Sequence, residues 1–358
     1  MKKFSKISRF VILFGLLIFF LYLAFRDINF SGLLTELGRT NYFLAILAML
    51  IGVYVGSWIR AYRWKYFLYP EKKELKLTDL FSAVMVGYFF NALIPRAGEL
   101  SRPFLLAQKY GISKAFTLGT IVVERIFDML SMFLVFGLCL MFYRDDLQKA
   151  FGEYNIEGIS LYFSIGMILF VVIVSIMLLK FDKTEKLIEK INNKILPEKY
   201  QAKVNRVLLS LISGFSFLKY PKYYYKIFLF TVLLWLDYAL STWVLMFAFK
   251  NDILNSLSYM DANLVLTLTS FAQTLPLPGN SAGSIHFFIK TTLNVVFGVD
   301  NETALAFGTV NHMLGFLGII TIGLYYSVKE NYKFSFKSSR EETPEIQSIS
   351  EKVEEKAH

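Results

Sequence analysis

Pro276-Leu-Pro-Gly-Asn-Ser-Ala-Gly-Ser284 is a run of small and helix-breaking residues in the middle of an apolar segment. A second apolar segment ends in a similar run, Asn91-Ala-Leu-Ile-Pro-Arg-Ala-Gly-Glu99. Neither run can continue a regular α-helix, because proline lacks a backbone donor and glycine favours turns. We therefore expect both segments to break and turn back as hairpins. The residues expected at the turns are Pro95 and Gly98 in the first hairpin, and Pro276, Pro278, Gly279, Ser281 and Gly283 in the second.

The composition is that of an integral membrane protein. Of the 358 residues, 55% are hydrophobic and only 18% are charged, which is too few to cover a water-facing surface. The net charge of +10 would suggest nucleic acid in a soluble chain, but here the basic residues lie between apolar runs, where they meet lipid headgroups. We therefore expect membrane phospholipid as the partner, and no nucleic acid. A single cysteine, Cys139, and three histidines argue against disulfide, metal or redox chemistry, so no metal and no cofactor are expected.

Eight apolar segments have about the 20 residues that a helix needs to cross the hydrocarbon core. They cover residues 10–25, 40–59, 80–95, 115–143, 158–179, 227–249, 262–289 and 303–328. The first lacks a small-residue cleavage site, so it is expected to stay as a helix and not to act as a signal peptide. Residues 184–196 repeat apolar residues at helical spacing, which favours a helix on the membrane surface over the alternative of a solvated loop.

Lysine and arginine counts distinguish two ways of threading these segments. If all eight cross the membrane, the two sides hold 19 and 17 basic residues, which is no bias. If 80–95 and 262–289 are re-entrant, the side with both termini holds 31 and the other side holds 5. Basic residues concentrate on the cytoplasmic side, so the second threading is favoured. It predicts an all-α polytopic protein of the cell (cytoplasmic) membrane with six full spans, two re-entrant hairpins and cytoplasmic termini.

This threading takes the two halves, about 1–143 and 158–328, through the same series of elements from opposite sides. Such an inverted-topology repeat brings the broken elements together near the bilayer midplane, where they form a substrate site. We therefore expect one transmembrane domain over 1–328. The tail 329–358 is rich in Lys, Glu and Ser and is expected to be a disordered cytoplasmic segment.

Polar residues surround the first break, namely Asn91, Arg96, Glu99 and Arg102. If a helix restarts after Gly98, the three charged residues are spaced so that they lie roughly on one face. Guanidinium groups bind phosphate bidentately, and a carboxylate between them can orient them or meet an ammonium group. A phospholipid headgroup is a natural ligand for this arrangement. The alternative is that these residues are ordinary interfacial charges that follow the positive-inside rule.

A second charged group, Glu124, Arg125 and Asp128, lies inside the apolar segment 115–143. Ionisable residues at such depth are costly and are seldom kept without a role or a partner. Asp237, alone in the middle of an apolar segment, is the expected partner of Arg125. The alternative is a purely structural network of ion pairs.

Together, the two charged groups are expected to form one polar cavity that receives a lipid headgroup. Arg96 and Arg102 would hold the phosphate, and Glu124 or Asp128 would meet an amine. Charges of both signs would neutralise a zwitterionic or aminoacylated phosphate that neither sign could balance alone.

Gly279-Asn-Ser-Ala-Gly283 formally matches the G-x-S-x-G motif of serine hydrolases, with His286 and His312 available as bases. That motif works on a strand-to-helix turn in an α/β sheet, and no parallel-sheet pattern exists here. A hairpin tip also favours small residues, which explains the same motif, so Ser281 is not expected to be a nucleophile. The two histidines are expected to pack against the hairpin or line the cavity, to which Lys290 would add positive charge.

At these motifs the chain resembles the transmembrane flippase domain of lysylphosphatidylglycerol synthases. The resemblance covers about 80–325 and rests on Asn91…Pro95-Arg-Ala-Gly98-Glu99…Arg102, Glu124-Arg125…Asp128 and Pro276-Leu-Pro278-Gly279…Gly283. It implies a flippase-like protein that translocates a polar, zwitterionic or aminoacylated phospholipid headgroup. Because the chain ends shortly after its last apolar segment, we expect a stand-alone member without the synthetase domain, served by a separate lipid-modifying enzyme. No oligomeric state is predicted.

The chain departs from the family pattern at the last motif, and two alternative functions stay open, one of them a scaffold without transport of its own. Family members usually carry a glutamate where this chain has Ile285 beside His286, and Asn280 replaces a common glycine. The resemblance extends to archaeal members linked to dolichol-phosphate sugar transfer, which implies a multi-span lipid-linked glycosyltransferase, or an accessory protein to one, as the other alternative. Asp27 lies where such enzymes place a catalytic aspartate, but the 26–40 loop is short and has no acidic pair, so enzyme activity is not expected.

Overall fold

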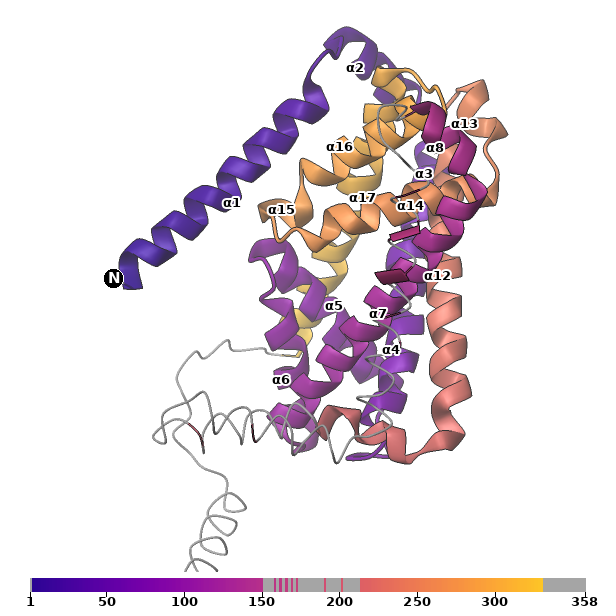
Figure 1. The fold of residues 1–358 in the computed structure, drawn as a ribbon. Helices are drawn as coiled ribbons and strands as arrows, with labels where there is room; N and C mark the ends of the chain where they lie inside the picture. The colour runs from indigo at the N-terminus through magenta and orange to yellow at the C-terminus, as the bar shows by residue number, and fades with distance from the viewer. Residues whose placement is uncertain are drawn as a thin grey trace, which may run out of the picture.

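The computed structural model describes residues 2–150 and 213–330, together with isolated positions between them (Figure 1). Most of the predicted segment 158–179, of the predicted surface helix 184–196 and of the predicted tail 329–358 lies outside the described residues. The described chain is helical throughout and contains no strand. This confirms the all-α prediction for that part of the protein.

Helices follow one another with short connections in both halves. The first half contains α1 (Lys2–Phe25), α2 (Phe30–Arg39), α3 (Tyr42–Met49), the π-helix η1 (Leu50–Val55), α4 (Gly56–Leu68), α5 (Leu77–Leu93), α6 (Gly98–Tyr110), α7 (Lys114–Phe142) and α8 (Arg144–Ala150). The described part of the second half contains the 3-10 helices η2 (Gly214–Lys219) and η3 (Pro221–Tyr223), then α12 (Tyr224–Met246), α13 (Asp252–Ser256), α14 (Tyr259–Thr274), α15 (Pro278–Ser281), α16 (Ser284–Thr291), the π-helix η4 (Thr292–Val296) and α17 (Asn301–Lys329).

Several of these helices are long and apolar enough to cross a membrane. Among the described residues they number four: Tyr42–Leu68, Lys114–Phe142, Pro221–Met246 and Asn301–Lys329. A fifth candidate combines the apolar part of α1 with α2, which are bent by 84° at the break between them. The described residues therefore give a multi-pass membrane protein with four to five candidate spans. Helix α5 is also apolar but is shorter.

The expected end of the second apolar segment at residue 59 is wrong. The helix formed by α3, η1 and α4 continues to Leu68 and carries Arg60 and Arg63 into the interior, where they are 5% and 0% exposed. Only 69–76 connects α4 to α5, so Arg60 and Arg63, which were assigned to the 60–79 loop, are not surface charges. The 26–40 segment, expected as a loop, contains helix α2.

Helices α5 and α6 form an antiparallel hairpin with a very close turn. Gly98 at the start of α6 packs on Gly87 of α5, and Lys109 near the end of α6 pairs with Asp79 at 3.0 Å. A Cβ on Gly98 would lie 1.8 Å from the Gly87 carbonyl oxygen, so glycine is required there. The Gly98 backbone N–H donates to the Asn91 side-chain oxygen at 2.7 Å and closes the turn. Helix α6 begins at Gly98, so the condition that a helix restarts there is met.

Helices α14 and α16 form a second hairpin, with the short α15 at its tip. Ser284 Oγ donates to the Ala272 carbonyl oxygen at 3.2 Å, which joins the two arms. Gly279 and Gly283 have φ values of 65° and 81°, a backbone region that glycine adopts without strain. The tip contacts both α5 and α1, so the two hairpins meet inside the molecule (Figure 1).

The loops gather at two opposite ends of the helices. At one end, Lys109 pairs with Glu330 at 2.8 Å, which places the base of the α5–α6 hairpin beside the end of α17. At the other end, Tyr143 donates to Asp261 at 2.6 Å and packs edge-on against Phe297, so both ends of the second hairpin lie near the end of α7. Each hairpin thus begins and ends at the same end of the molecule.

The first hairpin rests on an apolar core that also surrounds its charged residues. This core includes Trp64, Phe67, Phe81, Leu106 and Phe217, which come from α4, α5, α6 and η2. Charges beside such side chains are shielded from solvent, so their mutual interactions are stronger than at a surface.

Candidate functional site

Three helices bring charged side chains together inside the protein. Helix α4 contributes Arg60 and Arg63, α6 contributes Arg102, and α7 contributes Glu124 and Asp128. The side chains are nearly or completely buried, apart from Asp128 at 18% exposure. We call these five residues, with Glu99 and Arg125 at their edge, the charge cluster.

Arg102 and Glu124 form the centre of the charge cluster. Two parallel hydrogen bonds join them, from Nη1 to Oε1 at 2.9 Å and from Nη2 to Oε2 at 3.1 Å. The Arg102 guanidinium carbon lies 3.9 Å from the centre of the Trp64 ring, and Trp64 Nε1 donates to Thr120 Oγ1 at 2.9 Å. Bidentate pairing and stacking together fix the orientation of the guanidinium plane.

Arg60 and Arg63 belong to the charge cluster but were not predicted from the sequence. Arg60 Nη1 donates to both Glu124 and Asp128, with a distance of 2.9 Å to Asp128 Oδ2. Arg63 Nη2 donates to Asp128 Oδ1 at 2.5 Å, and Arg60 Nη2 donates to the Tyr238 hydroxyl at 3.2 Å. The available signal was their spacing of three in an aromatic-rich helical stretch, which puts both on one helix face.

The expected pairing of Arg125 with Asp237 is wrong. Arg125 lies 3.9 Å from Glu99 and 3.5 Å from Asp128. Asp237 instead lies on α12 against Gly56 of α4, and its Oδ2 has no hydrogen-bond partner within the described residues. The carboxylates that face Arg125 come from α6 and from its own helix.

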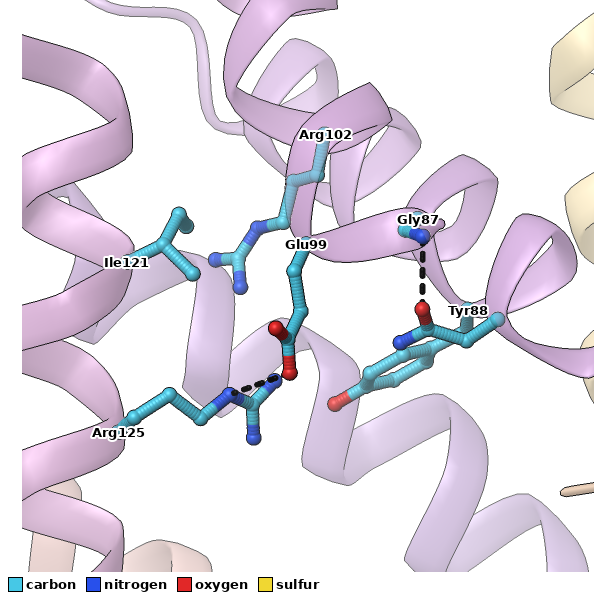
Figure 2. Close-up of a pocket in the computed structure, with 8 residues that line it drawn as sticks. Gly87, Tyr88, Glu99, Arg102, Ile121 and Arg125 are labelled. Atoms are coloured by element: carbon cyan, nitrogen blue, oxygen red, sulfur yellow. Dashed lines mark hydrogen bonds and ion pairs between the residues drawn. The ribbon is translucent and has the colours of Figure 1, made fainter. Parts of the chain in front are cut away.

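A small pocket of about 10 Å³, room for about one water molecule, opens between α5, α6 and α7 (Figure 2). It is lined by Gly87, Tyr88, Asn91, Gly98, Glu99, Arg102, Ile121 and Arg125. The side chains of Glu99 and Arg125 are 38% and 40% exposed, whereas that of Arg102 is 4% exposed. The pocket therefore has an accessible rim that carries one charge of each sign and a buried arginine deeper inside.

Arg96 lies apart from this pocket. It belongs to the turn between α5 and α6, where its φ is 64°, and its side chain is exposed. Because the turn residue precedes the helix, Arg96 does not share the α6 face with Glu99 and Arg102 as expected. Arg96 is at the tip of the first hairpin and does not line the pocket.

The charge cluster carries more positive than negative charge. Within the described residues, four guanidinium groups face three carboxylates. They belong to Arg60, Arg63, Arg102 and Arg125, and to Glu99, Glu124 and Asp128. Each of the four arginines has a buried Nε without a hydrogen-bond acceptor in the described chain. Unmet donors cost free energy, so an anion that accepted these hydrogen bonds would be bound favourably.

The polar residues of the second hairpin bond to its backbone. Ser281 Oγ donates to a carbonyl oxygen of the same turn at 2.7 Å. His286 Nδ1 accepts from the Gly283 N–H at 3.3 Å, and His312 Nε2 lies 2.9 Å from the Gly279 carbonyl oxygen. These three side chains brace the hairpin tip, and the described bonds include no Ser–His pair of the kind that a hydrolase uses.

Lys290 and Asp27 lie near the end of α1. The Lys290 ammonium donates to the carbonyl oxygens of Ala24 and Arg26 at 3.1 and 2.9 Å, and so caps that helix end. Asp27 pairs with Arg26 at 3.1 Å on the surface, and its side chain is 75% exposed. In the described ranges, no cluster of His, Cys, Asp and Glu side chains has the geometry to hold a metal ion.

Comparison with known proteins places the chain in a family. The family model of the lysylphosphatidylglycerol synthase TM region matches residues 8–323. UPF0104 membrane protein MJ1595 of Methanocaldococcus jannaschii is 28% identical over 167 residues, which make up 46% of this chain and 49% of that relative. No solved structure matches. Since the family model covers both hairpins and the whole charge cluster, the chain belongs to the lysylphosphatidylglycerol synthase transmembrane-region family.

Proposed function

We propose that this protein translocates a phospholipid headgroup across the bilayer and that the pocket between α5, α6 and α7 binds this headgroup. The substrate would join an anionic phosphate to a cationic amine, as in a zwitterionic or aminoacylated lipid. One observation carries the proposal: Arg102 and Arg125 line the pocket and keep unmet buried Nε donors in a cluster with surplus positive charge. A phosphate would accept hydrogen bonds from these donors and would balance the surplus positive charge.

The geometry favours different roles for the carboxylates from those that the sequence suggests. Glu124 is completely buried and is bound by Arg60 and Arg102, so it has little capacity left for an amine. Glu99 stands at the pocket rim, and its contact with Arg125 is long, at 3.9 Å. Glu99 is therefore the proposed acceptor for the amine, while Arg102 and Arg125 hold the phosphate.

The proposed membrane arrangement follows from the two ends of the molecule. Each hairpin returns to the end at which it begins, and the tips meet in the interior, as re-entrant elements of an inverted repeat would. The asymmetry of basic residues supports a cytoplasmic location for the end with Lys109 and Glu330. The protein would lie in the cytoplasmic membrane, and both termini would face the cytoplasm. A separate lipid-modifying enzyme would supply the headgroup.

Translocation of labelled lipids in liposomes tests this function. The purified protein should accelerate the movement of an amine-bearing phospholipid, measured by loss of fluorescence to an impermeant quencher. Arg125→Lys keeps the charge but loses the planar fork, and Arg102→Lys does the same deeper in the pocket. Charge-assisted hydrogen bonds contribute about 1.5–3 kcal/mol, so we expect translocation to slow by about 10- to 100-fold.

Arg39→Lys is the matched control, because Arg39 is 63% exposed and distant from the pocket in the sequence. It should translocate lipid at the wild-type rate. If the Arg125→Lys and Arg102→Lys proteins fold normally and translocate lipid at the wild-type rate, the pocket does not bind the headgroup. A wild-type protein that moves no lipid would overturn the proposed function itself.

A further inference from the structure

Asp237 is a buried carboxyl group that the headgroup pocket does not use. It lies within the candidate span Pro221–Met246 and is 7% exposed. Its Oδ2 is buried and accepts no hydrogen bond from any described residue. Glu124 and Asp128, the carboxylates of the charge cluster, are in contrast each held by at least two arginines. Asp237 therefore needs a different explanation from theirs.

Glycine on the facing helix brings Asp237 against a helix backbone. A Cβ built on Gly56 would lie 2.8 Å from Asp237 Oδ2. One turn away, a Cβ on Gly52 would lie 2.6 Å from Ser241 Oγ, which donates to the Ala48 carbonyl oxygen at 2.7 Å. The two glycines thus form a close seam with α12, and this seam encloses Asp237 without a hydrogen-bond donor for its Oδ2.

Several titratable and charged groups on the elements packed against α12 bind partners other than Asp237. Arg60 on α4 binds Glu124 and Asp128 on α7, while Tyr238, next to Asp237, accepts from Arg60. Arg63 on α4 binds Asp128 and also Thr231 of α12. Further examples are Tyr42 on α3 and Tyr259 on α14, which donate to the carbonyl oxygens of Leu37 and Leu236, Tyr54 on η1 against Phe81, Lys222 on η3 over Tyr69, and His312 on α17 against Gly279. None of these contacts supplies a cation to Asp237.

An ionised carboxylate in such a place would be strongly unfavourable. Burial of an isolated charge in a low-dielectric interior costs so much that the group takes up a proton and becomes neutral. The packed seam therefore stabilises the protonated form of Asp237. If the seam opened, water could solvate the carboxylate and the proton would leave.

We infer that Asp237 is a proton-binding site controlled by the contact between α4 and α12. With the helices packed, the carboxyl group holds a proton; when they separate, it gives that proton to water and becomes a carboxylate. Arg60 lies one turn beyond Gly56 on α4, but it binds Glu124 and Asp128 and so does not neutralise Asp237. The π-helix η1 directly precedes Gly56, and π-helical turns are frequent at functional sites.

The coupling of this site to transport rests on the proposed lipid translocation. A cycle in which Asp237 binds a proton on one side and releases it on the other would link one proton to each lipid moved. The protonation itself does not depend on that function, so the two parts can be tested separately.

Infrared spectroscopy of the full chain in lipid nanodiscs tests the protonation. At neutral pH the wild-type protein should show the carbonyl stretch of a buried protonated carboxyl group. Asp237→Asn should lack this band, and Asp252→Asn, at an exposed position on α13, should keep it. If Asp237→Asn does not fold, Asp237→Glu serves instead, because it keeps the carboxyl group and should shift the band. An unchanged band in either Asp237 variant would overturn the inference.

Liposomes with an imposed pH gradient test the coupling. One pH unit corresponds to about tenfold in an equilibrium for one proton per lipid, so the wild-type lipid distribution should shift by about tenfold. Asp237→Asn should still move lipid but ignore the gradient, whereas Asp252→Asn should respond like the wild type. A gradient response retained in Asp237→Asn would overturn the coupling. If the wild type moves no lipid at all, the proposed function fails, and the infrared result still decides whether Asp237 holds a proton.

Discussion

The Arg102 guanidinium and the Glu124 carboxylate face each other through two parallel hydrogen bonds of 2.9 and 3.1 Å, at side-chain exposures of 4% and 0%. Neither group could be buried alone without a large desolvation penalty. Their pairing joins α6 of the first hairpin to α7, and Arg60 extends the same contact to α4. Two ion pairs that share Glu124 thus link three helices beside the pocket.

Glu124→Gln should destabilise the protein strongly. The change keeps the shape of the side chain but leaves Arg60 and Arg102 without their shared negative partner. Removal of one member of a buried pair costs about 3–5 kcal/mol, because an uncompensated charge stays behind. Thermal unfolding of the purified protein in detergent should show a clearly lower midpoint. Glu71→Gln, at an exposed position, is the control and should unfold like the wild type; equal midpoints for both variants would refute the prediction.

Gly98→Ala should open the first hairpin. The new methyl group would lie 1.8 Å from the Gly87 carbonyl oxygen, and a backbone atom cannot move aside as a flexible side chain can. Overpacking of a filled interior costs about 1–3 kcal/mol or more. We expect a loss of monodisperse protein in fluorescence-detected size-exclusion chromatography. Gly38→Ala is the matched control, since nothing lies within 4 Å of its Cβ position.

Local sequence chemistry predicted the hairpins because proline and glycine act on the backbone within a few residues. Both helix breaks lie at the predicted positions, one at Pro95 and Gly98 and the other at Pro276. The tight approach of Gly98 to Gly87 was not predictable in the same way. It depends on the register of two antiparallel helices, which no local pattern specifies.

The charge cluster was predicted in part. Glu124 and Asp128 stood out because they interrupt an apolar segment, and Arg102 because of its spacing from Glu99 beside the first break. Arg60 and Arg63 follow the apolar run of their helix and looked like ordinary basic residues of a cytoplasmic loop. Only the tertiary contact with α7 shows them to be counter-ions. The same limit explains the wrong partner for Arg125, since charge complementarity alone does not indicate which helices are neighbours.

Lys109→Gln should loosen the base of the first hairpin slightly. Lys109 bridges Asp79 and Glu330 at 3.0 and 2.8 Å. Partial burial lowers the pKa of Lys109, but its hydrogen bonds to Glu330 and Asp79 outweigh this and raise the pKa overall. The raised pKa means that the stabilisation is complete below the ordinary lysine range and disappears as pH rises above it.

For a partly exposed ion pair of this kind we expect a stabilisation of the fold by about 0.2–1 kcal/mol at neutral pH. Denaturant unfolding of the wild type and of Lys109→Gln should differ by this amount at pH 7 and converge in strongly alkaline buffer. A difference that stays constant through the titration of lysine would mean that the bridge does not stabilise the fold. Lys73→Gln, at an exposed position, should show no difference at either pH.

Cysteine labelling should separate the two ends of the molecule. In a Cys139→Ala background, single cysteines at Lys73, Gln108 and Ser256 all occupy exposed positions. An impermeant maleimide applied to intact cells should label the cysteine at position 256 and spare those at 73 and 108, which should react only after the membrane is permeabilised. Equal labelling at 73 and 256, or opposite behaviour of 73 and 108, would contradict the re-entrant hairpin.

Glu99→Gln should change which lipids are moved, not whether lipid is moved. Glu99 is the carboxylate at the pocket rim, and loss of its charge removes the proposed contact with an amine but leaves Arg102 and Arg125 free to hold phosphate. A charged hydrogen bond is worth about 1.5–3 kcal/mol, so translocation of an aminoacylated lipid should slow by about 10- to 100-fold. Phosphatidylglycerol, which has no amine, should move at the wild-type rate or faster, because a neutral amide at this position does not repel its phosphate.

Paired translocation assays with the two lipids in the same liposomes measure this selectivity directly. Arg125→Lys provides the opposite case, because loss of the phosphate contact should slow both lipids together. Glu74→Gln, which removes a carboxylate at an exposed loop position, should leave both rates unchanged. If Glu99→Gln slows both lipids equally, Glu99 only positions Arg125. If it slows neither, the amine is recognised elsewhere and the assignment of Glu99 is wrong.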